Sequence, residues 1–513
     1  MKTKIIKLTM AMTAALFLST SCSEDFVEVS PKGTFFEDNY YKNEEQCYRS
    51  LVSVYDVLRK QSNGFENMIA MMNAGSDDFY AGGGGATDGT GMQSFSNYTI
   101  DEATIPGSFW NDYYSGVTRA NILLLKMPEA DFGNNEATRT RFTAEARALR
   151  AYYFFQLVTL FKNIPLITTR LETADLFDVP QNSPEEVYAF IETEMLAALA
   201  DLPVTLPAPA SPEVISPEAG RLTQGAVKAL LGRVYLYQKK WTQAAGQFAD
   251  VNGTPGGTSM YGYKLVDNYA SLWSVTNKFN TESIVEVYHT NKSNSSWDNW
   301  GSSSDEGNSL NQMVGPRGYG RPAGSTAPDF WSGWAFNPVT PSLVAAMGTD
   351  PRAASTILSM PALGAQATYA PAYMDTGYFL RKFMPLNSQR TDGGGTAELN
   401  FQQDTYIVRL ADTYLMEAEA LVNGGGDASR AQALLDAVRG RVGLPSIAAT
   451  EQNIFNERRL ELAGEGWRWF DLVRTGRAAT VLSDRGFQAN KNEVLPIPLR
   501  ERQNTLIEQN DGY

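Results

Sequence analysis

Apolar residues recur every three or four positions over several long segments, which is the spacing of helices that bury one face. We therefore predict helices over residues 109–127, 143–161 and 183–199. The third has the clearest start: Ser183 can cap the helix, Pro184 suits its first turn, and Glu186 stands at the capping-box position. Residues 203–220 are rich in Pro, Ala and Ser, and they are predicted to form a loop.

Residues 226–248 match the central pattern of a tetratricopeptide repeat, in which a small residue lets two antiparallel helices approach and aromatic residues fill the groove between them. The matching residues are Leu231, Gly232, Tyr235, Ala244 and Phe248. Lys228 stands where the pattern prefers Trp, so the repeat is degenerate. We predict a second copy over residues 406–439 and a further helix over residues 455–476.

The middle of the chain has a different character. A short β-like run at 282–290 is followed by a stretch rich in Gly, Ser, Asn and Pro, and residues 297–336 hold four of the nine tryptophans. A loop of that length without secondary structure is uncommon unless it has a function. The predicted fold is mainly α: a degenerate tetratricopeptide-like scaffold with an inserted loop-rich, partly β, ligand-binding region.

The amino terminus has the three parts of a secretory signal. Lysines precede an apolar run too short to span a bilayer, and small residues lead to Cys22. The small residues followed by Cys22 resemble a bacterial lipoprotein box, in which the cysteine becomes the acylated first residue. The alternative is a plain secretory signal. The predicted divisions are 1–21 (signal peptide), 22–40 (lipid-anchored tether), 41–251 (scaffold, with a loop at 73–100), 252–400 (ligand-binding region) and 401–513 (scaffold).

Composition narrows the function classes. The formal charge is −14 and becomes −17 once the three lysines of the signal are removed. Such a surface repels a phosphate backbone, so no nucleic acid is expected as a partner. The only other cysteine, Cys47, is expected to be buried in a helix. The single histidine, His289, excludes multi-histidine metal sites and is expected to be a structural or rim residue. The four glycines at 82–85 lack the spacing of a phosphate loop and are predicted to be flexible.

Several motifs together resemble the SusD/RagB-like outer-membrane lipoproteins of Bacteroidetes, which are glycan-binding partners of TonB-dependent transporters. The motifs are SCSEDF (21–26), FWNDYYSGVTRANILL (109–124), AEARALRAYYFFQLVTLFKNIPLI (144–167), the repeat at 226–248, TPSLVAAMGTDPR (340–352), YFLRKF (378–383), VRLADTYLMEAEAL (408–421), ERRLELAGEGWRWFDLVRTG (457–476) and VLPIPLRERQNTLIEQNDGY (494–513). The similarity runs from Cys22 to the last residue.

The resemblance implies a protein that binds glycan at the cell surface and does not cleave it. The helical scaffold would contact a SusC-like TonB-dependent transporter, and the acidic residues after Cys22 resemble a surface-export signal for the outer membrane. The strong motifs are expected to be scaffold. Within 457–476 we expect ion pairs of Arg458 and Arg459 with Glu461, a pair between Asp471 and Arg474, and core positions for Trp467, Trp469 and Phe470.

Two segments have the composition of a sugar site, because flat rings stack on sugar C–H faces while polar side chains pair with hydroxyls. The candidate glycan-binding residues are Trp297, Asp298, Trp300, Tyr319, Arg321, Trp331 and Trp334 in the long loop, with Asp77, Asp78 and Tyr80 before the glycines. Loop tryptophans can also build a local core, and we expect one or two of the four to face sugar, with Trp297 and Trp300 the best placed. Asp77 and Asp78 can equally cap their loop.

No cofactor is expected. The acidic residues at 298–306 do not match a calcium loop, so no metal site is predicted, although a structural calcium stays open. Two other functions remain as alternatives. One is peptide capture, which helical-repeat scaffolds often perform. The other is glycoside hydrolysis by paired carboxylates, against which the helical repeats argue.

Overall fold

A computed structural model describes residues 40–172, 174–207, 215–300, 307–391 and 393–513, and the structural statements below concern these residues. The predicted signal peptide, Cys22 and most of the predicted tether fall outside them. The longer helices are α2 (Glu44–Tyr55), α5 (Ser108–Lys126), α6 (Glu136–Phe161), α7 (Pro184–Leu199), α8 (Gln224–Tyr237), α9 (Trp241–Asn252), α14 (Leu410–Asn423), α15 (Ala428–Arg441) and α16 (Glu451–Glu461). None of the described helices is both long and apolar enough to cross a membrane.

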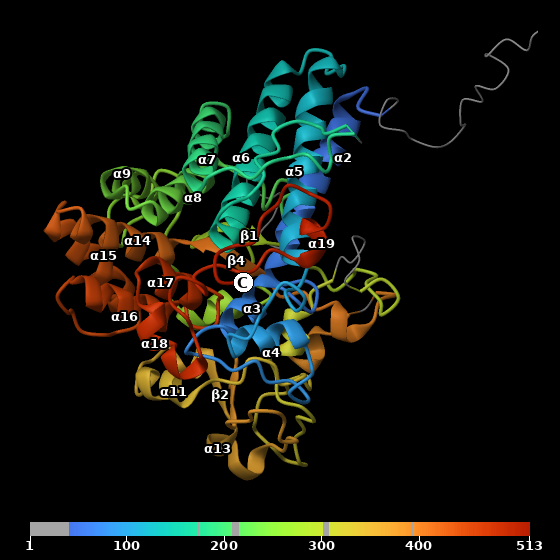
Figure 1. The fold of residues 1–513 in the computed structure, drawn as a ribbon. Helices are drawn as coiled ribbons and strands as arrows, with labels where there is room; N and C mark the ends of the chain where they lie inside the picture. The colour runs from blue at the N-terminus through green and yellow to red at the C-terminus, as the bar shows by residue number, and fades with distance from the viewer. Residues whose placement is uncertain (1–39, 173, 208–214, 301–306, 392) are drawn as a thin grey trace, which may run out of the picture.

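The long helices pack side by side in an order that follows the chain. Helix α5 packs on α6, α6 on α7 and α8 on α9, and α9 then meets α14, which packs on α15 and α16. In Figure 1, α2, α5, α6 and α7 form the upper part of the molecule, and the α8–α9 and α14–α15 pairs lie beside them. This is the predicted tetratricopeptide-like scaffold. A Cβ on Gly232 would lie 2.7 Å from the Phe248 ring, which explains the glycine where the two helices of the repeat meet.

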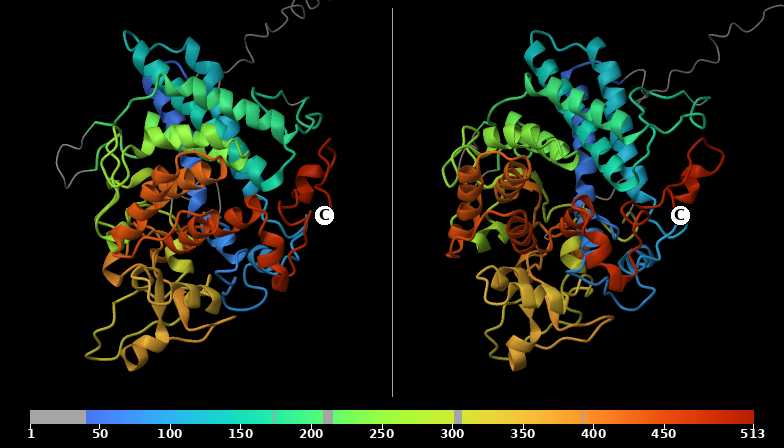
Figure 2. Two further views of the ribbon diagram at one scale, coloured as in Figure 1. Left: turned by 90° about the vertical axis from the view of Figure 1, so that its left-hand side faces the viewer. Right: turned by 60° about the vertical axis from the view of Figure 1, so that its left-hand side comes forward.

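Shorter elements make up the rest. The helices are α3 (Met68–Ala74), α4 (Thr90–Ser96), α10 (Leu310–Met313), α11 (Pro341–Met347), α12 (Ala353–Thr356), α13 (Met360–Leu363), α17 (Arg468–Arg474), α18 (Ala478–Val481) and α19 (Leu499–Arg502). The strands β1 (Ser283–Val287) and β4 (Thr405–Arg409) pair antiparallel, as do β2 (Ile357–Ser359) and β3 (Tyr378–Leu380). The elements from α11 to β3, coloured yellow to orange, lie in the lower part of the views of Figure 2, whereas β1 pairs with β4 next to the scaffold helices.

The sequence predicted most elements and misjudged three boundaries. Helix α6 begins seven residues before the predicted start at 143. The segment 406–439 does not begin as a helix, because its first residues belong to β4. The single helix predicted over 455–476 is two helices, since Gly464 and Gly466 adopt positive φ angles of 82° and 84° that end α16 and turn the chain into α17. The capping box at Ser183 is present as predicted.

A buried ion-pair network ties the inserted region to the scaffold. Glu461, at the end of α16, accepts bonds from Arg352 at 2.8 Å, from Arg409 at 2.6 Å and from Arg441. Arg409 also pairs with Glu282 at 2.8 Å, next to strand β1. All five side chains are buried. Burial opposes charge on Glu461, but the three guanidinium groups hold its pKa well below the ordinary value.

The ion pairs of the 457–476 motif differ in part from expectation. The arginines before Glu461 do not pair with it: Arg458 binds Asp412 at 2.7 Å and Asp471 at 3.0 Å, and Arg459 reaches back to Asp78. Arg458 is taken up by the acids of α14 and α17 and Arg459 by those before the glycine-rich loop, while Glu461 is bound by three other arginines. The pair between Asp471 and Arg474 is present at 2.6 Å, and Trp467, Trp469 and Phe470 are buried as predicted.

His289 is a buried structural residue, and Cys47 is buried in α2, both as predicted. The His289 Nε2 lies 2.7 Å from Ser62 Oγ, and the amine of Lys278 donates to the His289 carbonyl at 2.7 Å. Burial, with the nearby charges of Lys278 and Arg59, lowers the pKa of the imidazole to about 3. The ring is therefore neutral in the folded protein at pH 5, whereas it is charged in the unfolded chain.

This difference predicts a loss of stability in mild acid. Because the folded-state pKa is lowered, the unfolded state binds the extra proton below about pH 6.5, and going from pH 7 to pH 5 costs about 2 kcal/mol through this one group. His289→Gln, which can keep the bond to Ser62, should remove that component. Denaturant unfolding of both proteins at pH 7 and pH 5 measures it; equal pH dependence in the two would contradict the assignment.

Candidate functional site

Three tryptophans from the long loop meet at the surface and form what we call the tryptophan cluster: Trp297, Trp300 and Trp334. The rings of Trp297 and Trp334 are stacked, with centroids 5.8 Å apart and planes at 28°. The ring of Trp300 lies at 88° to that of Trp297 and at 69° to that of Trp334, with centroids 5.3 Å and 5.8 Å away. Trp297 is 52% exposed, while the other two are half-buried. The cluster thus offers an exposed ring on a supported aromatic base.

The backbone around Trp334 is held by hydrogen bonds and by strained residues. Trp334 N–H donates to the Gln312 carbonyl and Phe336 N–H to the Met313 carbonyl, both at 2.8 Å. Ala335 and Asn337 have φ angles of 61° and 52°, which non-glycine residues seldom adopt. Such strain persists only where the surroundings enforce it, and it concentrates at functional sites. The position of Trp334 is therefore fixed by its neighbours.

The glycine-rich loop at 82–85 supports this backbone from behind. Gly83 N–H donates to the Ala335 carbonyl at 2.8 Å. Gly82 has a φ of 71°, and a Cβ there would lie 2.3 Å from the Ala335 oxygen, so no larger residue fits. We expected a flexible loop that could mould around a ligand. The structure places Gly82 and Gly83 in close contact with residues 335–338, and the flexibility of the loop stays a prediction.

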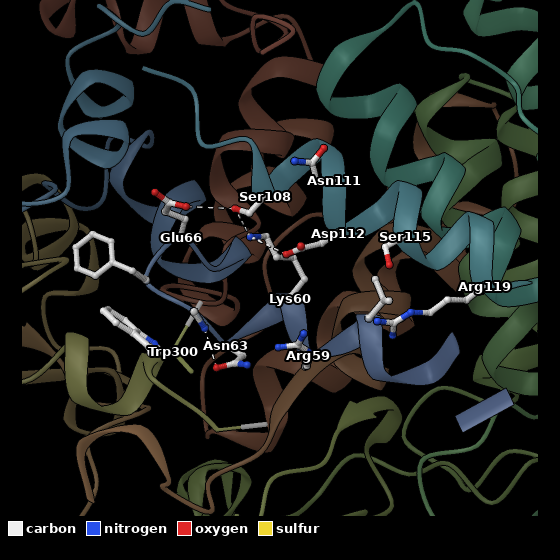
Figure 3. A pocket seen from close by; sticks show the side chains of 13 residues that line it. Arg59, Lys60, Asn63, Glu66, Ser108, Asn111, Asp112, Ser115, Arg119 and Trp300 are labelled. Atoms are coloured by element: carbon white, nitrogen blue, oxygen red, sulfur yellow. Dashed lines mark hydrogen bonds and ion pairs between the residues drawn. The ribbon is translucent and has the colours of Figure 1, made fainter. Parts of the chain in front are cut away.

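A polar pocket adjoins the cluster and shares Trp300 with it. We call it the α5 pocket; it has a volume of about 460 Å³ and is lined chiefly by polar residues of α5 and of the segment after α2. Figure 3 shows Trp300 and Glu66 on one side, with Asn111, Asp112 and Ser115 of α5 opposite. Phe65 also lines it and contacts the edge of Trp300, with ring centroids 5.8 Å apart.

The remaining loop candidates lie elsewhere. Tyr319 is buried and donates its hydroxyl to the Pro328 carbonyl at 2.8 Å, and Arg321 pairs with Asp329 at 3.0 Å. These residues line a different cavity of about 390 Å³. The indole N–H of Trp331 donates to Gln312 Oε1 at 2.6 Å, and its ring packs under the Arg390 guanidinium, 4.6 Å from the ring centroid. Tyr319 and Arg321 thus belong to a different cavity, while the ring of Trp331 packs against Phe401 and its neighbour Gln312 also holds the backbone of Trp334.

The acidic candidates before the glycine-rich loop are occupied by arginines. Asp77 binds Arg468 at 2.7 Å, and the buried Asp78 binds Arg459 at 2.6 Å. Burial opposes ionisation of Asp77, but hydrogen bonds from Arg468 keep its pKa below the ordinary value. Tyr80 packs under the Arg485 guanidinium at 4.9 Å. Both aspartates are thus held in ion pairs with α16 and α17, a role that neither the glycan-binding prediction nor the loop-capping alternative described.

Asp298 is exposed and stands between Trp297 and Trp300 in the sequence. It is the one acidic candidate from the long loop. Within the described ranges, no group of three or more His, Cys, Asp or Glu side chains is arranged to hold a metal ion. Part of the acidic segment 298–306, for which no metal site was predicted, lies outside those ranges.

The α5 pocket is what the sequence did not reveal. Its residues come from the segment after α2, from α5 and from the long loop. Those on α5, which include Asn111, Asp112 and Ser115, belong to a motif that we interpreted as scaffold. One signal was available. The aromatic residues of the predicted helix are interrupted by three polar residues: Asn111, Asp112 and Ser115. Ser115 lies about one turn after the other two, so the three polar groups share one side of the helix.

Comparison with known proteins was made by sequence and by structure. The model of the SusD family matches residues 238–513, and a second model, described as starch-binding associating with outer membrane, matches residues 25–236. A curated SusD-like protein of Bacteroides ovatus is 25% identical; the alignment covers 92% of this chain and 82% of that protein.

Two solved structures extend the comparison. A laminarin binding SusD-like protein is 54% identical, with a TM-score of 0.88 over 92% of this chain and all of that one. A surface glycan-binding protein A from Bacteroides thetaiotaomicron, solved in complex with laminarihexaose, is 25% identical, with a TM-score of 0.79 over 91% of this chain and all of that one. By its helical-repeat fold and by family models that together span residues 25–513 with one residue between them, the chain belongs to the SusD family.

Proposed function

We propose that this protein captures a laminarin-type β-1,3-glucan at the tryptophan cluster and does not cleave it. The observation that carries the proposal is the exposed, stacked Trp297 ring beside a pocket lined by amide, carboxylate and hydroxyl groups. Laminarin is the ligand named for the relative that is 54% identical, and a laminarihexaose complex is known for a more distant one.

The chemistry of the cluster suits a neutral sugar chain. Indole rings offer a large flat area to the C–H faces of sugars and lose little conformational freedom on binding. The net charge of −14 disfavours anionic polymers, whereas a glucan without charged groups pays no such electrostatic cost. Trp334 and the backbone beneath it hold the exposed ring in place before any ligand arrives, which lowers the entropic cost of binding.

The proposal extends to the place of the protein on the cell. We infer that an acylated Cys22 anchors it in the outer membrane, facing outward, and that its helical scaffold contacts a SusC-like TonB-dependent transporter that takes the captured glucan. The description of the second family model as associating with outer membrane supports the location. Stable anchoring needs more than one acyl chain, which lipidation of an amino-terminal cysteine provides.

Affinity electrophoresis of the chain from residue 23 onward tests this function. Gels containing laminarin, starch or no polysaccharide should show retardation by laminarin above all, and a reducing-sugar assay on the bound laminarin should show no release. Retardation by starch alone would show that the ligand is starch and not laminarin. Reducing-sugar release would show that the protein is an enzyme. Retardation that is abolished by added peptide, but not by added laminarihexaose, would favour peptide capture.

A further inference from the structure

Four charged residues that line the α5 pocket are already held in ion pairs: Arg59, Lys60, Asp112 and Arg119. Lys60 is buried, and its amine lies 3.3 Å from Asp112 and donates to Ser108 at 2.7 Å. At the other end of the pocket, Arg119 pairs with Asp56 at 3.0 Å. A charged ligand would have to break these pairs inside a partly enclosed space, where separated charges are costly. The pocket is therefore suited to an uncharged guest.

The remaining groups have the chemistry that sugar hydroxyls need. The side-chain amide of Asn111 and the hydroxyl of Ser115 make no hydrogen bond within the described part of the chain. Both residues line the pocket, as Figure 3 shows. The Asp112 carboxylate is 45% exposed, with free acceptor capacity beside its bond to Lys60. Glu66 is steadied by the hydroxyl of Ser108 at 3.3 Å. Amide, hydroxyl and carboxylate groups thus line one concave surface.

The shape of the pocket separates it from the tryptophan cluster. It is hollow where the cluster is a flat platform, and its volume of about 460 Å³ lies within the range of small-ligand sites, about 300–1,000 Å³. Trp300 belongs to both, so a chain lying on the cluster passes the mouth of the pocket. In a β-1,3-linked glucan the C6 hydroxymethyl group projects from the ring and takes no part in the chain linkage. A unit attached there leaves the ring faces free to stack.

We propose that the α5 pocket is a subsite for a single glucose residue joined through C6 to the β-1,3-glucan on the tryptophan cluster. Asn111, Asp112 and Ser115 bind the hydroxyls of this side residue, and the Trp300 edge marks the branch point. This inference rests on the proposed function and adds to it the preferred substrate, a glucan with side residues over a strictly linear one.

The test compares two oligosaccharides by isothermal titration calorimetry on the chain from residue 23 onward. One is laminarihexaose, and the other is the same hexasaccharide carrying one β-1,6-linked glucose. Two added hydrogen bonds predict about 5- to 10-fold tighter binding of the branched compound. The double variant Asn111→Ala/Ser115→Ala should bind both compounds with the affinity of the wild type for the linear one. Thr118→Ala, an exposed change on the same helix outside the pocket, should change neither.

The possible outcomes distinguish failure of the side-residue subsite from failure of the proposed glucan capture. Equal binding of the two compounds by the wild type would overturn the side-residue subsite while leaving glucan capture intact. Equal weakening of both compounds in the double variant would also overturn it, because the pocket would then hold the main chain. Binding of neither compound by the wild type would remove the proposed function and this inference together.

Discussion

Glu461→Gln is expected to lower the free energy of unfolding by about 3–5 kcal/mol, the range for breaking a buried ion pair by removing one partner. Three guanidinium groups converge on this carboxylate: Arg352, Arg409 and Arg441. The substitution keeps the shape of the side chain but leaves that positive charge with fewer counter-ions inside the protein. Urea unfolding followed by circular dichroism measures the loss.

A control on the same helix makes the result specific. Glu451 opens α16, pairs with Arg477 at 2.8 Å and is 52% exposed. Because exposed pairs and first-turn acids contribute little, Glu451→Gln should cost less than about 1 kcal/mol. Similar losses in the two variants would show that the network at Glu461 is not what joins the inserted region to the scaffold.

Trp297→Ala is expected to raise the Kd for laminarihexaose at least about 30-fold, the equivalent of a 2 kcal/mol hot spot. Trp297 is the exposed ring of the tryptophan cluster, and its removal takes away stacking area without opening the core. Titration calorimetry measures the affinity, and an unchanged melting temperature shows that the fold is intact.

Tyr288 provides the matched control. It is 48% exposed, close to the exposure of Trp297, and its ring stacks on Phe279 in another part of the surface. If exposed aromatic area alone mattered, Tyr288→Ala would weaken binding as much as Trp297→Ala. We expect less than a twofold change. Equal losses, or an unaffected Trp297→Ala variant, would move the site away from the tryptophan cluster.

The scaffold could be predicted because its signals are local. Helical spacing and the capping box at Ser183 act through neighbours a few positions away, and Gly232 meets Phe248 on the very next helix. The break between α16 and α17 was missed because the motif reads as one periodic run, although Gly464 and Gly466 stand inside it. Glycines at such positions signal a turn only when they are weighed against the periodicity around them.

The site was predictable only in part, because it depends on contacts between distant residues. Flanking Ser and Asn residues favoured Trp297 and Trp300 as surface rings, and the structure places both in the cluster. Asp77 and Asp78 looked equally suitable, but each meets an arginine more than 380 residues later in the chain. No local pattern announces such a partner. The α5 pocket was missed for the same reason, since its walls meet only in the fold.

A crystal structure of the chain from residue 23 onward with laminarihexaose tests the central claim most directly. We predict a glucose ring stacked against the exposed face of Trp297, with the chain running past Trp300 at the mouth of the α5 pocket. A hexasaccharide bound in the cavity of Tyr319 and Arg321, or anywhere else away from the tryptophan cluster, would contradict the account.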